Sequence, residues 1–304
     1  NSINLDDTVK SNENFYIGKQ WEGVQANGLP TPQFNIIKRV VGFTTATITT
    51  DNIKVNATLL NKTARADGFV EPVRIINDEF EFLTEMNDIP ALMREFTRNA
   101  AVDGDGCMYT YWDESIEAGN GVKGGIKTEI VPNTRVFFGN PNDRDVQSQP
   151  YIQISTREIV RRAKRRAKAN KITDWQNIIA DCDSATATDS VKRTDDKVTT
   201  ILTMWRDEDT GEIWAYESTQ NCDIKKPWSL GIKLYPICWL SWDYIQDCYH
   251  GQAMITGLIP NQIFINKAFA MSMLSMMRSA WPKYVYDRTR IKNWDNRVGG
   301  AIGV

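Results

Sequence analysis

Residues 249–284 read YHGQAMITGLIPNQIFINKAFAMSMLSMMRSAWPKY, and this stretch determines how the rest of the chain is interpreted. Pro260 suits the first turn of a helix, because its missing N–H group would have no partner there anyway. Pro282 ends the run, since proline cannot continue a helix. The intervening segment of about 21 residues has no other proline or glycine, which predicts one helix roughly 30 Å long.

Apolar side chains lie on nearly every face of this predicted helix. At about 3.6 residues per turn, the bulky side chains form several rows along the helix axis. These rows contain Ile263, Ala270, Leu274 and Met277, then Ile265, Phe269 and Met276, then Phe264 and Met271. A further row contains only small side chains, namely Ala268, Ser272, Ser275 and Ser279. A helix that is apolar on every face must be surrounded by other apolar groups.

The predicted surroundings of this helix are protein rather than lipid. Asn266, Lys267 and Arg278 interrupt the apolar run, which is far shorter than the roughly 20 residues that a membrane span needs. A row of small residues allows another helix to approach closely, while the opposite bulky row fills a groove on a neighbour. The helix could therefore pack against copies of itself in a ring or bundle. The alternative is a central core helix of one monomeric domain.

The composition is that of an ordinary globular protein. Charged residues are 24% and apolar residues 41% of the 304 residues, which is enough chain for one large or two modest domains. The formal net charge of −2 indicates no class of partner. The five cysteines are scattered and contain no CxxC pair. This argues against a disulfide framework or a zinc site and favours a reducing compartment.

The predicted order of elements is helices, then consecutive strands, then the long helix. We expect a polar arm over 1–14, a helix over 35–42, a strand over 44–55, and a helix over 77–101 that is capped by Asn77 or Asp78 and broken at 88–90. Alternating, β-branched stretches predict strands over 107–112, 127–131, 135–138, 151–154 and 235–242, and a hairpin over 198–206 and 212–217. Consecutive strands predict an α+β fold with antiparallel sheet rather than a doubly wound nucleotide-binding fold.

A basic helix is predicted over residues 157–170, with Ser155 or Thr156 as its cap, followed by a short helix over 175–182 and a mobile loop over 183–196. Residues 157–171 contain eight Lys or Arg and one Glu, a local charge of +7 that leaves −9 on the rest of the chain. One interpretation is contact with nucleic-acid phosphates. The other is a solvated helix paired with acidic neighbours. The cationic candidates are Arg161, Arg162, Lys164, Arg165, Arg166 and Lys168.

Catalytic and metal-binding motifs are not recognisable in this sequence. His250 is the one histidine, and without a nucleophile motif we interpret it as a hydrogen-bonded structural residue at the entry to the long helix. Residues 103–106 (DGDG) lack the remaining ligands of a calcium loop and are interpreted as a turn. Asp143, Asp145 and residues 207–209 also lie in predicted turns. We therefore predict no cofactor, no metal and no nucleotide site.

Four groups of segments carry a resemblance to a known family. They are residues 15–21 (FYIGKQW) with 29–30 and 35–37, residues 99–106, residues 137–151 with the turn at 140–145, and residues 249–267. Together they resemble the portal proteins of tailed bacteriophages. The last group is similar to the passage into the stem helix of that family.

The resemblance implies a structural ring, usually of twelve subunits, at one vertex of the capsid in the virion. Its channel passes double-stranded DNA during packaging and ejection. Terminase docks on the ring and is later replaced by head–tail connector proteins, while the major capsid protein surrounds it. Portal proteins carry out no chemistry themselves. By this resemblance, residues 1–250 are the wing, 251–281 the stem helix, and 282–304 the start of the clip.

The resemblance also indicates which side chains of the stem helix meet other molecules. Subunit contacts would involve Ile263, Ala268, Ala270, Ser272, Leu274, Ser275, Met277 and Ser279. Lys267 and Arg278 join the basic helix as candidate DNA contacts. Portal proteins continue through the clip to a second stem helix and a crown. Because this sequence begins at Asn1 and contains neither part, we expect it to be a piece of a longer polypeptide.

Two functions from different classes remain open from the sequence. The first is a ring component with a DNA-conducting channel. The second is a metal-dependent nucleic-acid-processing enzyme that uses the Asp and Glu clusters together with the basic helix. A capsid or tail component of another kind would share the structural role of the first and differ in ring order.

Overall fold

The structure is a computed structural model that describes residues 4–25, 28–50, 54–59, 68–117, 123–181, 196–280, 284–287, 289–290 and 301–303. The loop expected over 183–196 lies outside the described residues, except for Asp196. Most of the expected clip, residues 282–304, lies outside them as well.

The described chain has the mixed architecture that the order of elements predicts. Its helices are α1 (Leu5–Ile17), α2 (Ile36–Ile48), α4 (Val70–Met86), α5 (Ile89–Asp103), α6 (Val160–Ala169) and α7 (Met254–Ala280). Its strands are β1 (Asp105–Glu117), β2 (Lys123–Ile130), β3 (Val136–Phe138), β4 (Tyr151–Ile159), β5 (Lys197–Arg206), β6 (Ile213–Thr219), β7 (Asp223–Ser229), β8 (Ile237–Ser241), β9 (Tyr284–Tyr286) and β10 (Ala301–Gly303). The α+β class with a long C-terminal helix is confirmed.

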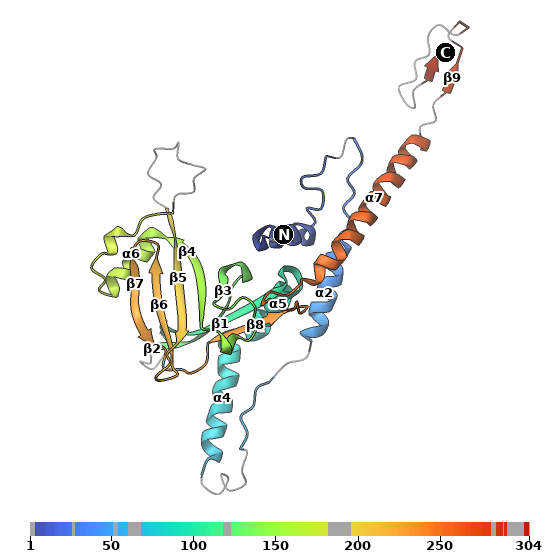
Figure 1. Cartoon of the computed structure of the whole chain (residues 1–304). Coiled ribbons are helices and arrows are strands. Elements are labelled where there is room, and N and C mark those ends of the chain that lie inside the picture. Colours follow the sequence, from blue (N-terminus) through green and yellow to red (C-terminus); the bar gives the residue numbers. More distant parts are fainter. Residues whose placement is uncertain are drawn as a thin grey trace.

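Two sheets form the body, and two helices project from it. Figure 1 shows the sheet β3-β4-β5-β6-β7 at one side, with the sheet β2-β1-β8 between it and the helices. Both sheets are antiparallel, as predicted, whereas the short pair β9 and β10 is parallel. In the same view, α4 points down and α7 points up, away from the body (Figure 1). Both helices therefore extend beyond the packed core.

The five-stranded sheet has one covered face along most of its length. On β6, Ile213 and Ala215 are fully buried while the residues between them are less so, as expected where successive side chains point to opposite faces. The predicted hairpin is confirmed as β5 and β6. α6 covers one end of the sheet through Ala163 and Ala167, which pack in a cluster with Ile172, Ile178, Val198, Cys222 and Ile224.

The start of α7 is fixed on the small sheet by a tight turn between α5 and β1. Gly104 has a φ of +100°, and a Cβ there would lie 2.6 Å from the carbonyl oxygen of Gly251, so only glycine fits. The buried carboxylate of Asp105 accepts a hydrogen bond from the Gly251 N–H at 2.7 Å and lies 2.7 Å from His250 Nδ1. The interpretation of residues 103–106 as a turn is confirmed, and so is the predicted hydrogen bonding of His250 at the entry to the long helix.

The helices α1, α2 and α5 form the base against which α7 packs. An apolar cluster joins Ile37, Val41, Ala101, Val102 and Ile255 from α2, α5 and α7. These side chains are almost completely buried. Burying each of the Ile and Val side chains stabilises the base by about 1.5–3 kcal/mol, so the first turns of α7 are firmly attached.

Two predictions for the N-terminal region are wrong. Residues 5–14 are not a polar arm but belong to α1, which Asn4 caps by accepting a hydrogen bond from the Asp6 N–H. Residues 44–48 are not a strand, because α2 continues through them. Thr44 and Thr47 donate their hydroxyl groups to the carbonyl oxygens four residues earlier. This bonding accommodates β-branched threonines within a helix.

Helix boundaries differ from the predicted ones in the middle of the chain. α4 begins at Val70 rather than at Asn77 or Asp78, because the Asn77 side chain instead pairs with both backbone groups of Ala57. The predicted break near residues 88–90 is confirmed between α4 and α5. β7 was not predicted, and its Pro227 is tolerated because β7 is an edge strand.

The basic helix is shorter than predicted at its N-terminus. Ser155 and Thr156 do not cap it, because residues 155–159 remain in β4 and pair with β5 as far as Lys197. α6 therefore begins at Val160, without a side-chain cap. The short helix predicted over 175–182 is reduced, within the described residues, to a 3-10 turn at 175–177.

The long helix starts earlier than predicted. α7 runs from Met254 to Ala280, so Pro260 lies inside it rather than at its first turn. The carbonyl group of Thr256 therefore has no helical N–H partner, because proline supplies none. Of the described helices, none is both long and apolar enough to cross a membrane.

Candidate subunit interface

α7 contacts the rest of the chain over only part of its length. The helix has 27 residues and is therefore about 40 Å long. Its buried residues, Ile255, Gln262, Asn266 and Ala270, recur at helical spacing on one face. Of the residues from Met271 to Ala280, none is buried. The second half of the helix thus extends past the base.

A ladder of side-chain amides attaches α7 to the N-terminal region. Gln262 Nε2 donates to the Phe34 carbonyl at 2.6 Å and to Asn266 Oδ1 at 2.9 Å, while Gln262 Oε1 accepts from the Ile36 N–H at 3.2 Å. Asn266 Nδ2 donates to Gln20 Oε1 at 2.6 Å. Because buried amides need partners, this network fixes the rotation of α7 about its axis. Its signal in the sequence is two amides four residues apart in an otherwise apolar helix.

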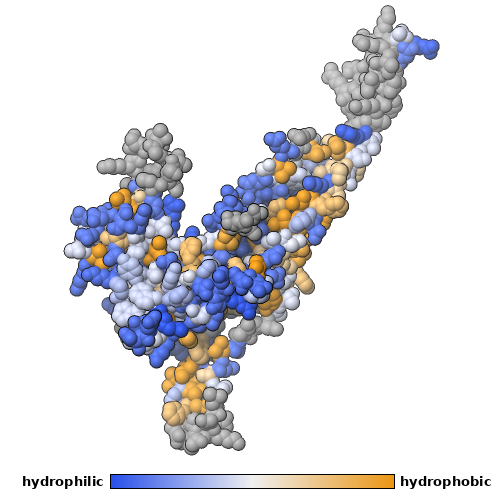
Figure 2. Space-filling view, in the orientation of Figure 1, coloured by the Kyte–Doolittle hydropathy of each residue, from blue (hydrophilic) through white to orange (hydrophobic). Residues whose placement is uncertain are grey.

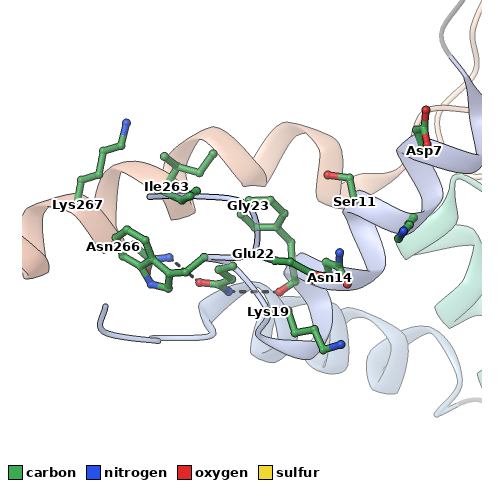
Figure 3. A pocket seen from close by; sticks show the side chains of 14 residues that line it. Asp7, Ser11, Asn14, Lys19, Glu22, Gly23, Ile263, Asn266 and Lys267 are labelled. Carbon is green, nitrogen blue, oxygen red and sulfur yellow. Dashed lines mark hydrogen bonds between the residues drawn. The ribbon is translucent and has the colours of Figure 1, made fainter. Parts of the chain in front are cut away.

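A hollow of about 590 Å³ lies beside this ladder, between α1, the segment 19–24 and α7. Figure 3 shows Asn266 turned toward the segment 19–24, while Lys267 points away from it. Phe15, Trp21 and Ile263 give the hollow an apolar lining beside these polar groups. The side of α7 that carries Ile263 is therefore open next to the base.

α7 exposes large apolar side chains on several faces, at Phe264 beside the base and at Met271, Met276 and Met277 beyond it. The exposed fractions are 72% for Phe264, 61% for Met271, 63% for Met276 and 57% for Met277. Figure 2 shows hydrophobic residues along much of the projecting rod. Single exposed apolar residues are common on proteins, but a contiguous patch marks a surface for binding. The alternative of a central core helix does not fit this half of α7.

The residues predicted at the interface differ in their exposure. Ile263, Ser272, Ser275, Met277 and Ser279 are exposed. Ala268 and Leu274 are partly buried. Ala270 is only 2% exposed and belongs to the face that packs on the base, so its predicted role in a subunit contact is wrong.

The small and bulky rows of α7 lie on nearly opposite sides. At 3.6 residues per turn, the row of Ala268, Ser272, Ser275 and Ser279 is about 160° around the helix from the row that contains Ile263, Leu274 and Met277. A head-to-tail contact joins two different surfaces of identical subunits, and it closes into a ring when the rotation permits. The distribution of side chains on α7 suits that kind of contact.

α1 is attached to α5 by a second polar cluster. Arg98 pairs with Glu13 at 2.5 Å, and the Asn12 amide donates to the Val102 carbonyl at 2.9 Å. Burial raises the pKa of the neighbouring Asp103 carboxyl to about 7, and Glu13 adds to the shift while Arg98 opposes it. One oxygen of Asp103 has no hydrogen-bond partner among the described residues.

One flank of α6 is neutralised by carboxylates of the sheet. Arg166 pairs with Glu217 and, at 2.9 Å, with Glu158, and Arg162 lies 3.7 Å from Glu158. Burial alone would lower the pKa of Arg166, but Glu217 and Glu158 outweigh it and raise the pKa. These pairs agree with the interpretation of a helix paired with acidic neighbours, for this flank only. Arg166 is committed to the sheet and is not a free DNA contact.

The other flank of α6 borders a second hollow, of about 550 Å³. Its cationic lining consists of Arg161, Lys164, Arg165 and Lys168. Lys168 Nζ lies 5.6 Å from the centroid of the Trp175 ring. None of the four cations forms an ion pair with a described residue. The structure thus divides the predicted basic run into a paired and an unpaired side.

The remaining candidates do not join the basic side of α6. Lys267 and Arg278 are exposed on α7, which Figure 1 places far from α6. Asp143 and Asp145 accept backbone N–H groups two residues further on, and Asp207 bonds Thr210 in the same way within its own turn. No three His, Cys, Asp or Glu side chains of the described residues lie together as a metal site.

Comparison with known proteins identifies no family for this chain. No protein-family model matches the sequence, and no curated protein matches it either.

Proposed function

We propose that this chain is a subunit of a bacteriophage portal, a structural ring at one capsid vertex through which double-stranded DNA passes. The observation that carries the proposal is the outer half of α7, which exposes large apolar side chains while its inner half is attached to the base. Burying each such side chain against a neighbour would contribute about 1.5–3 kcal/mol. Several together would offset much of the free-energy cost of bringing two subunits together.

In this proposal, α7 of one subunit packs between the α7 helices of two others. The bulky row of one helix meets the small row of the next, and the repeated rotation closes the ring. Lys267 and Arg278 are the charges of α7 available to a channel or to a neighbour. The sequence resemblance supplies the partners, which are terminase, head–tail connector proteins and the major capsid protein. It also supplies the location, which is the virion.

The mass of the assembled protein tests the proposal. Light scattering during size-exclusion chromatography should give a multiple of the 34.6 kDa chain mass. Electron-microscope images down the particle axis should then show a ring, and the number of subunits separates a portal from other ring-forming capsid or tail components. A monomer at every concentration would overturn the proposal.

The alternative of a metal-dependent nucleic-acid-processing enzyme has no cluster of ligands among the described residues in its favour. Incubation with plasmid and Mg²⁺ or Mn²⁺ separates the two functions. The portal proposal expects intact plasmid, whereas cleavage that a chelator abolishes would support the enzyme.

A further inference from the structure

The cations of α6 that lack carboxylate partners share one stripe of the helix. Arg161, Lys164, Arg165 and Lys168 follow the spacing i, i+3, i+4 and i+7, so they lie beside one another on one face. We call these four residues the basic stripe. Ala163 and Ala167 face the sheet. Because these alanines hold α6 against the sheet, the helix cannot rotate about its axis. The orientation of the basic stripe is therefore fixed.

The carboxylates near α6 do not neutralise this stripe. Glu158 and Glu217 are already bonded to Arg162 and Arg166 on the opposite flank. Among the described residues, Asp196 is the one acidic residue that lines the hollow beside the stripe. Within that part of the chain, four cations next to one carboxylate leave a local excess of positive charge, which a polyanion would match.

We propose that the basic stripe binds the phosphate backbone of double-stranded DNA without reading its sequence. The stripe spans about 10 Å of helix, and phosphates follow one another every 3.4 Å or so along each strand, so about three phosphates of one strand fit along it. Flexible cations can each take a phosphate, but they do not by themselves select a base. Trp175, Ile178 and Ile179 line the hollow beside the stripe, and the Lys168 ammonium group lies 5.6 Å from the centroid of the Trp175 ring.

This site is separate from the proposed channel. It lies on α6 at the far side of the sheets from α7 (Figure 1), and its chemistry does not require a ring. The proposal that the basic stripe binds DNA can therefore be tested independently of the portal proposal.

The test measures how DNA binding depends on salt. A short labelled duplex is titrated with the protein by fluorescence anisotropy, using two unrelated sequences. Each phosphate that is neutralised contributes a slope of about −0.9 to the plot of log K against log salt. We expect the quadruple variant R161Q/K164Q/R165Q/K168Q to bind both sequences more weakly and to lose about three units of that slope, since about three phosphates are neutralised.

A charge-matched control removes four exposed cations elsewhere, R39Q/K123Q/K226Q/K233Q. It should retain the wild-type slope. If the control loses as much affinity as the stripe variant, or if the stripe variant binds like the wild type, the proposal is overturned. If poly-glutamate displaces DNA at equal charge and binding to it is lost in the same variant, the stripe serves an acidic protein segment instead. Should the quadruple variant fail to fold, the double variant R161Q/R165Q gives the same comparison with half the expected change in slope.

Discussion

At the scale of single residues, Asp103 should affect how stability depends on pH. Its folded-state pKa of about 7 lies above the unfolded value of about 3.9, so the folded protein holds a proton that the unfolded chain has lost. The free energy of unfolding therefore falls as pH rises from about 4 to about 7, and it does not fall further from this cause above that range.

Asp103→Asn cannot ionise and should remove this part of the pH dependence. Urea titrations across the window would show the variant gaining stability over the wild type as pH rises. The exposed loop variant Asp209→Asn serves as the control and should follow the wild type. Parallel pH curves for Asp103→Asn and the wild type would contradict the assignment.

A second residue-scale prediction concerns the amide ladder. Asn266→Ala removes the donor to Gln20 Oε1 and the acceptor for Gln262, and leaving buried polar groups unpaired costs about 1–3 kcal/mol. Urea unfolding should show that loss. Ser272→Ala on the exposed side of the same helix should stay within about 0.5 kcal/mol of the wild type. Equal effects of the two substitutions would show that the ladder does not stabilise the fold.

At the scale of elements, the outer half of α7 should control assembly rather than folding. Met276 and Met277 are exposed in the subunit, and Met277 belongs to the bulky row, so M276E/M277E should leave the unfolding midpoint nearly unchanged. The same charges placed in a subunit interface would be buried without partners, which is strongly unfavourable. We expect this variant to lose the assembled species in light scattering.

The matched control for this variant is I232E/L234E, which places the same charges on two exposed apolar residues outside α7. It should assemble like the wild type. Assembly of M276E/M277E at wild-type concentrations would show that the bulky row of α7 is not the contact surface.

Element types could be predicted where local pattern and tertiary pairing agree. The alternation of β5 and β6 identified their hairpin, and the proline near residue 90 identified the break before α5. The predicted boundaries of helices were wrong where contacts with residues distant in the sequence determine them. Thr156 is a good helix cap by residue type, yet it pairs with Thr200 in the sheet, and Asn77 bonds Ala57 rather than starting a helix.

At the scale of the whole molecule, the sequence predicted the α+β class and the apolar rows of α7, because both follow from local periodicity. It could not predict which row faces the base. That depends on contacts such as the one between Asn266 and Gln20, which are 246 residues apart. The same limit applies to α6, where Glu217 of a later strand decides which cations are neutralised.

The position of Pro260 has a consequence for the width of any opening that such rods enclose. The backbone bond missing at Thr256 makes this the weakest joint of α7 to bending. On one side of this point Ile255 is buried in the apolar cluster of the base. On the other side Gln262 and Asn266 are hydrogen-bonded to the N-terminal region. In the proposed ring, the inclination of each α7 helix would thus be fixed by side-chain amides rather than by the helix itself. Replacing those amides would let the helices of that ring splay or converge, and the bore between them would change without any alteration of the residues that line it.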